Sequence, residues 1–514
     1  MRYALPTLAF LFLLSCITAA QTPDTLSRIG RLRGAVELGG LVSDGPQTPF
    51  WLRTNQYGIV PLGGSAGTLR AGIYRNYQSV SLAANVPDSV AKKARRRLDW
   101  GFGLNIVGNT GPVNLPNSNL DDARQVLWPE VFAKVRFGRV ELFAGRRREV
   151  YGLGDTTLTS GFYAWSGNAI PFPKIQLHTP GFVPVGWLRK AVSFRFGYAH
   201  GWFTQPNIQG AMLHQKYLYL KLGKPTAKLS FTMGINHQVQ WGGRADYLAN
   251  TIYSVDGQLP QTFRDYVSVI LATYPAELQN AQYTEFDGTN RVGNHLGSID
   301  FAFDWSDARR SWLLYHQHAY EDASGLAFQN IPDGLTGLSW HSRRPARRGT
   351  LRLARVVLEV LSTTDQSGDT FDFKNRFQGR DNYFNHGQYV QGWSYRGRTI
   401  GTPFIAPRTT FSQLVNANEG GGFFPNNRLT MWYLAAEVLV GQTIRLTGRV
   451  SWSRNFGTYD QVYKTPYEQT SALLSGQGRL PRLPNIWLTA SVAIDRGQVY
   501  PNAVGGFVSL QKRW

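Results

Sequence analysis

The feature that most constrains this chain is an alternation of apolar and polar side chains over unusually long stretches. In LDWGFGLNIVG, residues 98–108, every second side chain from Leu98 to Ile106 is apolar. The same pattern recurs in residues 228–236, 443–456 and 486–495. A period of two is typical of a β-strand whose two faces meet different surroundings.

The length of these stretches separates two kinds of β-protein. Strands of soluble proteins usually have about five or six residues, whereas a tilted strand needs about 9–11 residues to cross a bilayer. The second face is charged in places, as at Arg445 and Arg449. Lipid outside and water inside would explain both faces. We therefore predict an all-β fold, a transmembrane antiparallel β-barrel of about 16–18 strands.

Further candidate strands lie throughout the chain. Several end in Trp, Tyr or Phe, as the aromatic girdles of membrane barrels do. The candidates are 35–43, 68–86 (as one or two strands), 130–137, 139–145, 191–203, 213–222, 298–306, 310–319, 351–361, 388–396, 429–440 and 504–514.

Insertions interrupt the strand pattern, and we expect them to plug part of the lumen. The longest covers residues 242–297 and has Phe263, Tyr266, Val267 and Ile270 at helical spacing, which predicts a helix within 260–282. Residues 146–190 and 362–387 are irregular. In NIPDGLTGLSW, 330–340, the residues Pro332, Gly334 and Gly337 indicate a turn.

The first twenty residues, MRYALPTLAFLFLLSCITAA, have the organisation of a secretory signal peptide. Cleavage after Ala20 would leave residues 21–514 as a single barrel domain without cysteine, held together by its own sheet. Acylation at Cys16 is the alternative. The last residues, VGGFVSLQKRW, alternate up to Trp514, and such a terminal aromatic strand resembles the signal that barrel insertion machinery recognises.

The charge is strongly positive, with 54 Lys and Arg against 33 Asp and Glu, or +21. For an exported protein this favours acidic polysaccharide, lipopolysaccharide phosphates or anionic lipid as partners over nucleic acid. Arg146, Arg147 and Arg148 could bind such groups through paired donors. Alternatively, they pair with wall acids such as Glu141 and Glu149. The basic stretches 91–100 and 341–350 could bind acidic groups or serve as solvated turns.

Catalysis and metal binding have weak support. His316 and His318 share one face of a strand, which would allow a metal pair, but spacing fixes no third ligand. A hydrogen-bonded pair in the lumen is the alternative. No G-x-S-x-G motif is present, and adjacent carboxylates such as Glu321 and Asp322 point to opposite faces of a strand. We expect no enzyme, no metal and no cofactor.

A set of blocks resembles the capsule assembly protein Wzi family in a Bacteroidetes-like form. These blocks are TPFWLRTNQYGIVPL (48–62), GRRREVYGLGDTTLTSGFYAWSGNAIPFPKI (145–175), HQKYLYLKLG (214–223), GINHQVQWGG (234–243), LGSIDF (296–301), YEDASGLAFQNIPDGLTGLSW (320–340) and GRDNYFNHGQYVQGWSYRGRTIGTPF (379–404). The resemblance implies an outer-membrane barrel that attaches capsule or exopolysaccharide by lectin-like, non-catalytic binding. The enterobacterial form has an N-terminal helical bundle, whereas only about fifteen residues, 21 to 35, precede the first strand pattern here.

The expected mechanism is physical binding by arginines and aromatic rings in the lumen and at its rim, with avidity along a repeating polymer. Asp333 is expected in the lumen or at the rim. A porin-like channel for anionic solutes or oligosaccharides and a hydrolase at the barrel rim, with His316 or His386, are the alternatives. The predicted contact residues are Arg146, Arg147, Arg148, Trp165, Trp340, Arg343, Arg344, Trp393 and Arg396.

Overall fold

The computed structural model describes residues 32–77, 98–111, 126–274, 284, 286, 290–345, 349–372, 377, 379–412, 422–483 and 485–514. The predicted signal peptide, residues 1–20, lies outside this part of the chain. Among the described residues, no helix is long and apolar enough to cross a membrane.

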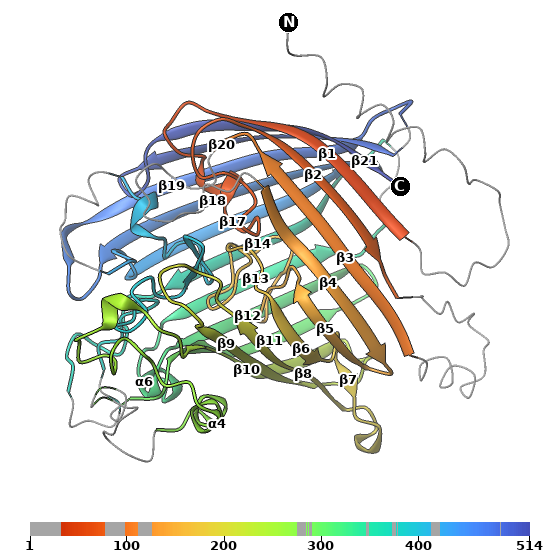
Figure 1. Ribbon diagram of the computed structural model, residues 1–514. Helices are drawn as coiled ribbons and strands as arrows, with labels where there is room; N and C mark the ends of the chain where they lie inside the picture. Colours follow the sequence, from red (N-terminus) through yellow and green to blue (C-terminus); the bar gives the residue numbers. More distant parts are fainter. Residues whose placement is uncertain are drawn as a thin grey trace, which may run out of the picture.

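The described strands form one antiparallel sheet of nineteen, which closes because the first strand, β1, pairs with the last, β21. Figure 1 shows this closed wall. The strand β7 has two residues and continues the pairing of β6 along β8, so eighteen longer strands make the wall. The strands are β1 (Leu32–Ser43), β2 (Ala66–Arg75), β3 (Leu98–Asn109), β4 (Val126–Phe137), β5 (Val140–Arg146), β6 (Lys174–His178), β7 (Val183–Pro184), β8 (Val192–Trp202), β9 (Met212–Leu222), β10 (Leu229–Trp241), β11 (Asn294–Ser306), β12 (Arg310–Tyr320), β13 (Gly334–Ser342), β14 (Leu351–Ser362), β17 (Leu429–Val440), β18 (Ile444–Gly457), β19 (Val462–Arg479), β20 (Ile486–Gly497) and β21 (Ala503–Arg513).

The two ends of the barrel differ in the length of their connections. The end where β1 begins and β21 ends has mostly short turns, such as 138–139, 307–309 and 441–443. The three longest connections, 147–173, 242–293 and 363–428, lie at the opposite end, which also has 44–65; the turn end has one connection as long as 44–65, at 76–97. We call these the turn end and the loop end.

The outer face of the wall carries an apolar belt. Leu218, Leu220, Met233, Leu434 and Leu474 point outward and are between 39% and 60% exposed. Outward tryptophans flank the belt, with Trp100 and Trp312 near the turn end and Trp128, Trp202 and Trp432 near the loop end. This is the surface that a bilayer with two interfaces requires.

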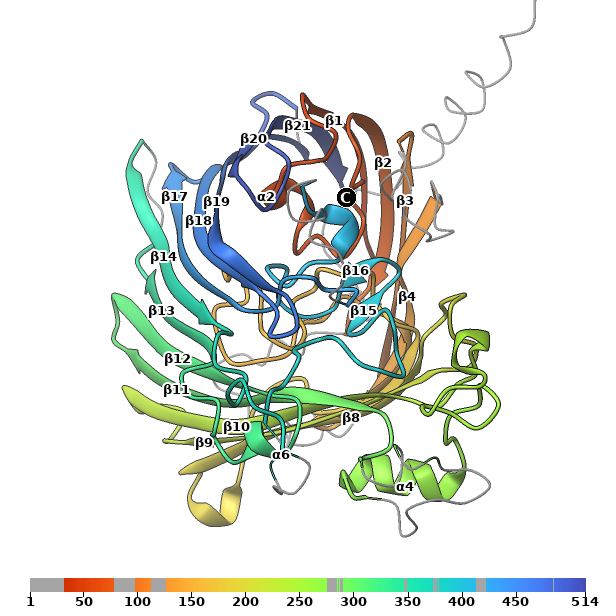
Figure 2. The same ribbon diagram turned by 90° about the vertical axis from the view of Figure 1, so that its left-hand side faces the viewer.

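Residues 44–65, 147–173 and 379–412 fold into the lumen, and we call them the plug. In Figure 2 these segments cross the interior of the barrel. Buried aromatic rings, including Trp51, Tyr163, Trp393 and Tyr395, form its core. The plug contains the helix α2 (Phe50–Arg53), the 3-10 turn η3 (Arg408–Thr410) and the hairpin of β15 (Ser394–Tyr395) and β16 (Arg398–Thr399).

Polar side chains of the wall tie the plug in place. Gln317 accepts a hydrogen bond from the Tyr163 amide at 3.0 Å and donates one to the Leu153 carbonyl at 2.9 Å. Glu359 accepts from the Ser160 amide at 2.6 Å. The polar inner face therefore satisfies the backbone of the plug, in line with the predicted partial plugging.

The insertion between β10 and β11 contains the helix α4 (Phe263–Leu271), as its helical spacing predicts. The side chain of Thr262 and the carboxylate of Asp265 form a capping box at its start. Figure 2 shows α4 outside the barrel wall, beside β8 and β10. The remaining short elements are η1 (Gly186–Leu188), η2 (Asp246–Leu248) and α6 (Ala323–Leu326).

Three expectations about local structure are wrong. Residues 388–396 are not a wall strand but part of the plug, because their aromatic residues pack inside the lumen. Gly334 and Gly337 belong to strand β13 and not to a turn; a Cβ on Gly337 would lie 2.2 Å from the Tyr315 ring. Residues 146–190, expected to be irregular, contain β6.

One long wall strand was not predicted at all. Strand β19 carries Pro466 and polar residues on both faces near the loop end, which hides the alternation.

Candidate functional site

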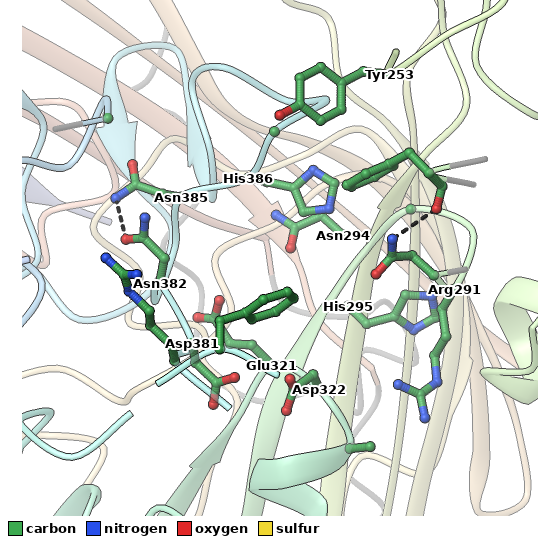
Figure 3. Close-up of a pocket in the computed structure, with 18 of the residues that line it drawn as sticks. Tyr253, Arg291, Asn294, His295, Glu321, Asp322, Asp381, Asn382, Asn385 and His386 are labelled. Atoms are coloured by element: carbon green, nitrogen blue, oxygen red, sulfur yellow. Dashed lines mark hydrogen bonds between the residues drawn. The ribbon is translucent and has the colours of Figure 1, made fainter. Parts of the chain in front are cut away.

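A cavity of about 1150 Å³ opens at the loop end. Three connections form it: β10 to β11, β12 to β13 and β14 to β17. Figure 3 shows residues of all three facing the same space. Long loops on a rigid wall are the usual place for a binding site, and we call this space the loop-end cavity.

Aromatic rings line the cavity from several loops. Tyr253 meets Phe286 edge-on, with ring centroids 5.0 Å apart, and Phe286 in turn faces His386 at 6.4 Å. Phe371, Phe377 and Phe423 also line it. Such rings offer flat apolar surface, and tyrosine adds a hydroxyl.

Three carboxyl groups, Glu321, Asp322 and Asp381, form the floor (Figure 3). Asp381 accepts hydrogen bonds from Ser367 Oγ at 3.0 Å and Ser324 Oγ at 3.1 Å. Burial, and next the neighbouring Asp322 carboxylate, raise the pKa of Asp381 to about 9. At neutral pH this floor therefore holds a protonated carboxyl, which can donate a hydrogen bond.

Glu321 joins this floor to the plug. Its carboxyl group accepts hydrogen bonds from the Phe384 amide at 2.9 Å and the Tyr163 hydroxyl at 3.1 Å. Burial raises the pKa of Glu321 well above its ordinary value. The base of the cavity is thus fixed to the plug by buried hydrogen bonds.

Asn294, the first residue of β11, contributes an unused donor. Its residue is 3% exposed and lines the cavity, and its Nδ2 has no hydrogen-bond partner in the structure. A buried donor without a partner costs free energy comparable to a lost hydrogen bond. Because that atom is itself closed to solvent, a ligand oxygen in the cavity would reach it only after the side chain rotates.

The two arginines of the lining are already engaged. Arg380 forms an ion pair with Asp460 at 2.7 Å, and Arg291 donates to the Ala272 carbonyl at 2.8 Å. Asn385 bonds Asn382 and the Phe424 carbonyl, both at 2.9 Å. The cavity therefore combines rings, amides and carboxyl groups, a chemistry that fits a ligand rich in hydroxyl groups.

The predicted arginine cluster lies where β5 enters the plug and not in this cavity. Arg147 forms ion pairs with Glu141 and, at 2.7 Å, with Glu149, so the pairing interpretation holds for this residue. Arg148 forms an ion pair with the wall residue Glu130 at 3.6 Å and donates to Asn105 Oδ1 at 3.1 Å, so it also pairs with a wall acid.

Four of the predicted residues meet inside the lumen. Arg146 donates to the Tyr395 hydroxyl at 3.5 Å. Arg396 donates to Thr204 Oγ1 at 3.2 Å, and Thr204 is in turn hydrogen-bonded to the Tyr395 hydroxyl. Trp165 and Trp393 contact edge-on at 6.1 Å. These tryptophans are 6% and 0% exposed and build the plug.

The other three lie at the turn end. Trp340 faces outward beside Trp312, with ring centroids 6.5 Å apart, and is not in the lumen. Arg343 and Arg344 follow it in the turn to β14, where Arg343 donates to the Asp307 carbonyl at 2.9 Å. The predicted residues thus occupy three separate places, and none lines the loop-end cavity.

The histidine pair faces the outside of the barrel. His316 bonds Thr336 Oγ1 at 2.8 Å and His318 bonds the Gly325 carbonyl at 3.0 Å. The neighbouring Gln317 points into the lumen, so the expected lumenal placement of this pair is wrong. Within the described ranges, no group of three or more His, Cys, Asp or Glu residues could hold a metal. Asp333, in contrast, is buried under the cavity floor, where Tyr383 donates to it at 3.0 Å.

The residue types of the cavity were visible in the sequence but not their convergence. Acids, amides and aromatics mix in 320–330, directly after β12, and in 379–390, within the connection from β14 to β17. That mixture within long insertions is the signal that could have indicated a site.

The closed wall, apolar belt, aromatic girdles and filled lumen define an outer-membrane β-barrel that is closed by its own loops. The family described as capsule assembly protein Wzi matches residues 75–405. The chain belongs to this family, which confirms the predicted resemblance.

One solved structure supports the fold. Wzi of Escherichia coli, an outer-membrane protein involved in group 1 capsule assembly and a carbohydrate-binding β-barrel, is similar with a TM-score of 0.55 and 13% identity. The match covers 93% of this chain and 83% of that one. OccAB4 of Acinetobacter baumannii gives a TM-score of 0.45 and 8% identity, over 95% of this chain and 99% of its own. No curated protein matches the chain.

Proposed function

We propose that this protein binds carbohydrate at the loop end, without catalysis, and serves capsule or exopolysaccharide assembly or its attachment to the cell surface. The observation that carries the proposal is the loop-end cavity, with its aromatic rings and the free Asn294 donor above a filled lumen. Membership of the Wzi family and the carbohydrate binding of the E. coli protein support it.

The lengths of the connections indicate how the barrel is oriented in the outer membrane. Outer-membrane barrels have short periplasmic turns and long extracellular loops, so the loop end would face outward and the cavity would meet surface polymer. The signal peptide 1–20 and the terminal strand β21, which ends beside Trp514, would direct export and insertion into the outer membrane.

The preferred ligand is an acidic capsular or exopolysaccharide. The +21 net charge attracts an anionic polymer over distance, and the rings, amides and carboxyl groups of the cavity hold individual sugar units. Basic loops would also meet lipopolysaccharide phosphates. Many weak contacts along the polymer would add up to avidity.

The direct test is binding of purified protein, reconstituted in detergent or liposomes, to an acidic polysaccharide and to a neutral one of similar length. We expect the acidic polymer to bind more tightly and to lose that advantage as salt rises. Equal binding of both polymers would remove the acidic preference, and binding of neither would remove the proposed function.

The filled lumen supports binding over the porin-like alternative. In planar bilayers we expect little steady conductance, and a large, stable open current would favour the channel. The hydrolase alternative predicts shortened glycan that depends on His386 or His316. Unchanged glycan length after incubation is the result that we expect.

A further inference from the structure

The helix α4 is fastened to the outside of the barrel and not to the plug. Tyr266 stacks on the Trp241 ring with centroids 5.2 Å apart, and its hydroxyl lies 2.8 Å from that of Tyr198. Lys216 donates to the Ile270 carbonyl. Figures 1 and 2 both show this helix beside the wall at the loop end.

A small apolar core lies between the helix and the wall. Val269 packs with Val239, Trp241 and Val292 and is fully buried. The donors from Lys216 and Arg291 also satisfy carbonyls at the C-terminal end of α4, where such groups have no partner within the helix. The helix is thus held in one orientation.

A second apolar face of the same helix points away from the wall and is exposed among the residues that the structure describes. Phe263, Val267 and Leu271 are 81%, 38% and 64% exposed. Their spacing of four residues places them in one row along the helix. A row of large apolar side chains turned to water is unfavourable, at about 25 cal/mol per Å².

The polar residues of α4 are gathered on the remaining side. Successive residues of a helix are about 100° apart. On this spacing, the side that faces the wall carries Tyr266, Val269 and Ile270, and the adjoining side carries Phe263, Val267 and Leu271. The third side carries Arg264, Asp265 and Ser268. The helix therefore has a wall side, an adjoining apolar side and a polar side. An amphipathic helix in a membrane interface has this division.

The belt of the barrel continues into the free apolar side. Tyr198, Lys216 and Trp241, which hold the helix, point outward on β8, β9 and β10. Leu218 and Leu220 follow Lys216 on the same outward face of β9 and are 48% and 39% exposed. The helix consequently sits at the loop-end border of the lipid-contacting surface.

We propose that α4 is an interfacial membrane anchor, which inserts Phe263, Val267 and Leu271 among the lipid acyl chains at the loop-end rim. The partner is the lipid of the leaflet that surrounds the loop end. This proposal is independent of carbohydrate binding. The anchor holds the long β10 to β11 insertion, one wall of the loop-end cavity, against the membrane surface.

Site-directed spin labelling tests the anchor. The only cysteine of the chain is Cys16, so single labels can be placed in a Cys16→Ala background by Phe263→Cys, Val267→Cys or Leu271→Cys. Each protein is reconstituted in phosphatidylcholine liposomes, and its collisions with oxygen and with a water-soluble nickel chelate are measured. Retained heat-shifted electrophoretic mobility identifies folded barrel.

Two matched positions calibrate the result. Leu218→Cys reports the lipid belt on the neighbouring strand, and Arg264→Cys reports the polar side of the same helix. We expect labels at 263, 267 and 271 to collide with oxygen in preference to nickel, as at 218, and the label at 264 to show the opposite preference.

Two results would overturn the anchor. Nickel accessibility at 263, 267 and 271 equal to that at 264 would place the whole helix in water. Spin–spin broadening at these positions that grows with the protein-to-lipid ratio would show that a second copy of the chain covers the face instead.

Discussion

Arg355 on strand β14 donates two hydrogen bonds to the carboxylate of Asp155 in the plug, at 2.9 and 2.7 Å. Asp155 also accepts from Ser339 Oγ on β13 at 2.7 Å and from the Thr157 and Leu158 amides. One buried carboxylate therefore joins two wall strands to the plug. It acts as a latch for the segment 147–173.

Breaking this latch should loosen the plug while the barrel stays closed. We expect Asp155→Asn to lower plug stability by about 2 kcal/mol, because hydrogen bonds to a charged group are lost. Brief conductance bursts in planar bilayers and faster proteolysis within 147–173 would report the loosening. Arg310→Gln, which breaks an exposed pair with Asp307, is the control and should change neither. An absence of conductance bursts with Asp155→Asn would show that the latch is dispensable.

The apolar belt predicts that a charged residue on the outer face lowers the free energy of unfolding in a bilayer. Leu434 points outward from β17 and is 43% exposed. A charge there would have to enter the hydrocarbon, so we expect Leu434→Arg to destabilise the barrel by about 2–4 kcal/mol. Urea unfolding in liposomes measures the change, and Leu434→Phe should be nearly neutral. An equal stability of the two variants would mean that lipid does not cover this position.

The loop-end cavity predicts which residues bind glycan. Asn294→Leu removes the free donor, and Tyr253→Ala removes a ring of the lining. We expect each to weaken binding about tenfold, which corresponds to about 1.4 kcal/mol. Arg343→Gln at the turn end should leave affinity unchanged, although the sequence singled out this arginine. Titration calorimetry with one polysaccharide compares the affinities of the three variants. A loss of affinity in Arg343→Gln alone would place the binding site at the turn end.

The cavity floor predicts a pH dependence. Burial raises the pKa of Asp381 from 3.8 to about 9, so between these values the folded protein keeps a proton that the unfolded chain has released. Its contribution to stability is complete below pH 4 and is lost as pH rises through 9. We expect hydrogen exchange in 379–390 to speed up towards pH 9 more than the pH dependence of intrinsic exchange explains. Asp381→Asn should flatten this excess slope, and an unchanged slope would assign it to another group.

The wall was predictable because lipid imposes a simple rule on the sequence. Every second residue meets hydrocarbon, and the alternation in 98–108 or 486–495 follows directly. The alternation is lost where a strand extends beyond the lipid, as at Pro466 in β19. It is also lost where small residues face the plug, as at Gly337 in β13. The helix α4 was also predictable, since its period is local.

The plug and the cavity were not predictable in the same way. Their residues meet others hundreds of positions away, as when Trp393 donates to the Ala164 carbonyl at 2.8 Å. Arginine and tryptophan were expected to bind sugar, but both also link and fill a polar lumen, and the structure uses most of the predicted ones for that purpose. The cavity instead relies on Asn294, Asp381 and Tyr253, which no local pattern distinguishes.

The pairing of β1 with β21 has a consequence for biosynthesis. The ends of the wall meet when the Gly34 and Trp514 backbones exchange hydrogen bonds, each at 3.1 Å. A chain cut short before β21 keeps two open sheet edges, whose amides and carbonyls find no partner in hydrocarbon. Only a chain translated through β21 can therefore close, so the whole wall depends on synthesis of this strand.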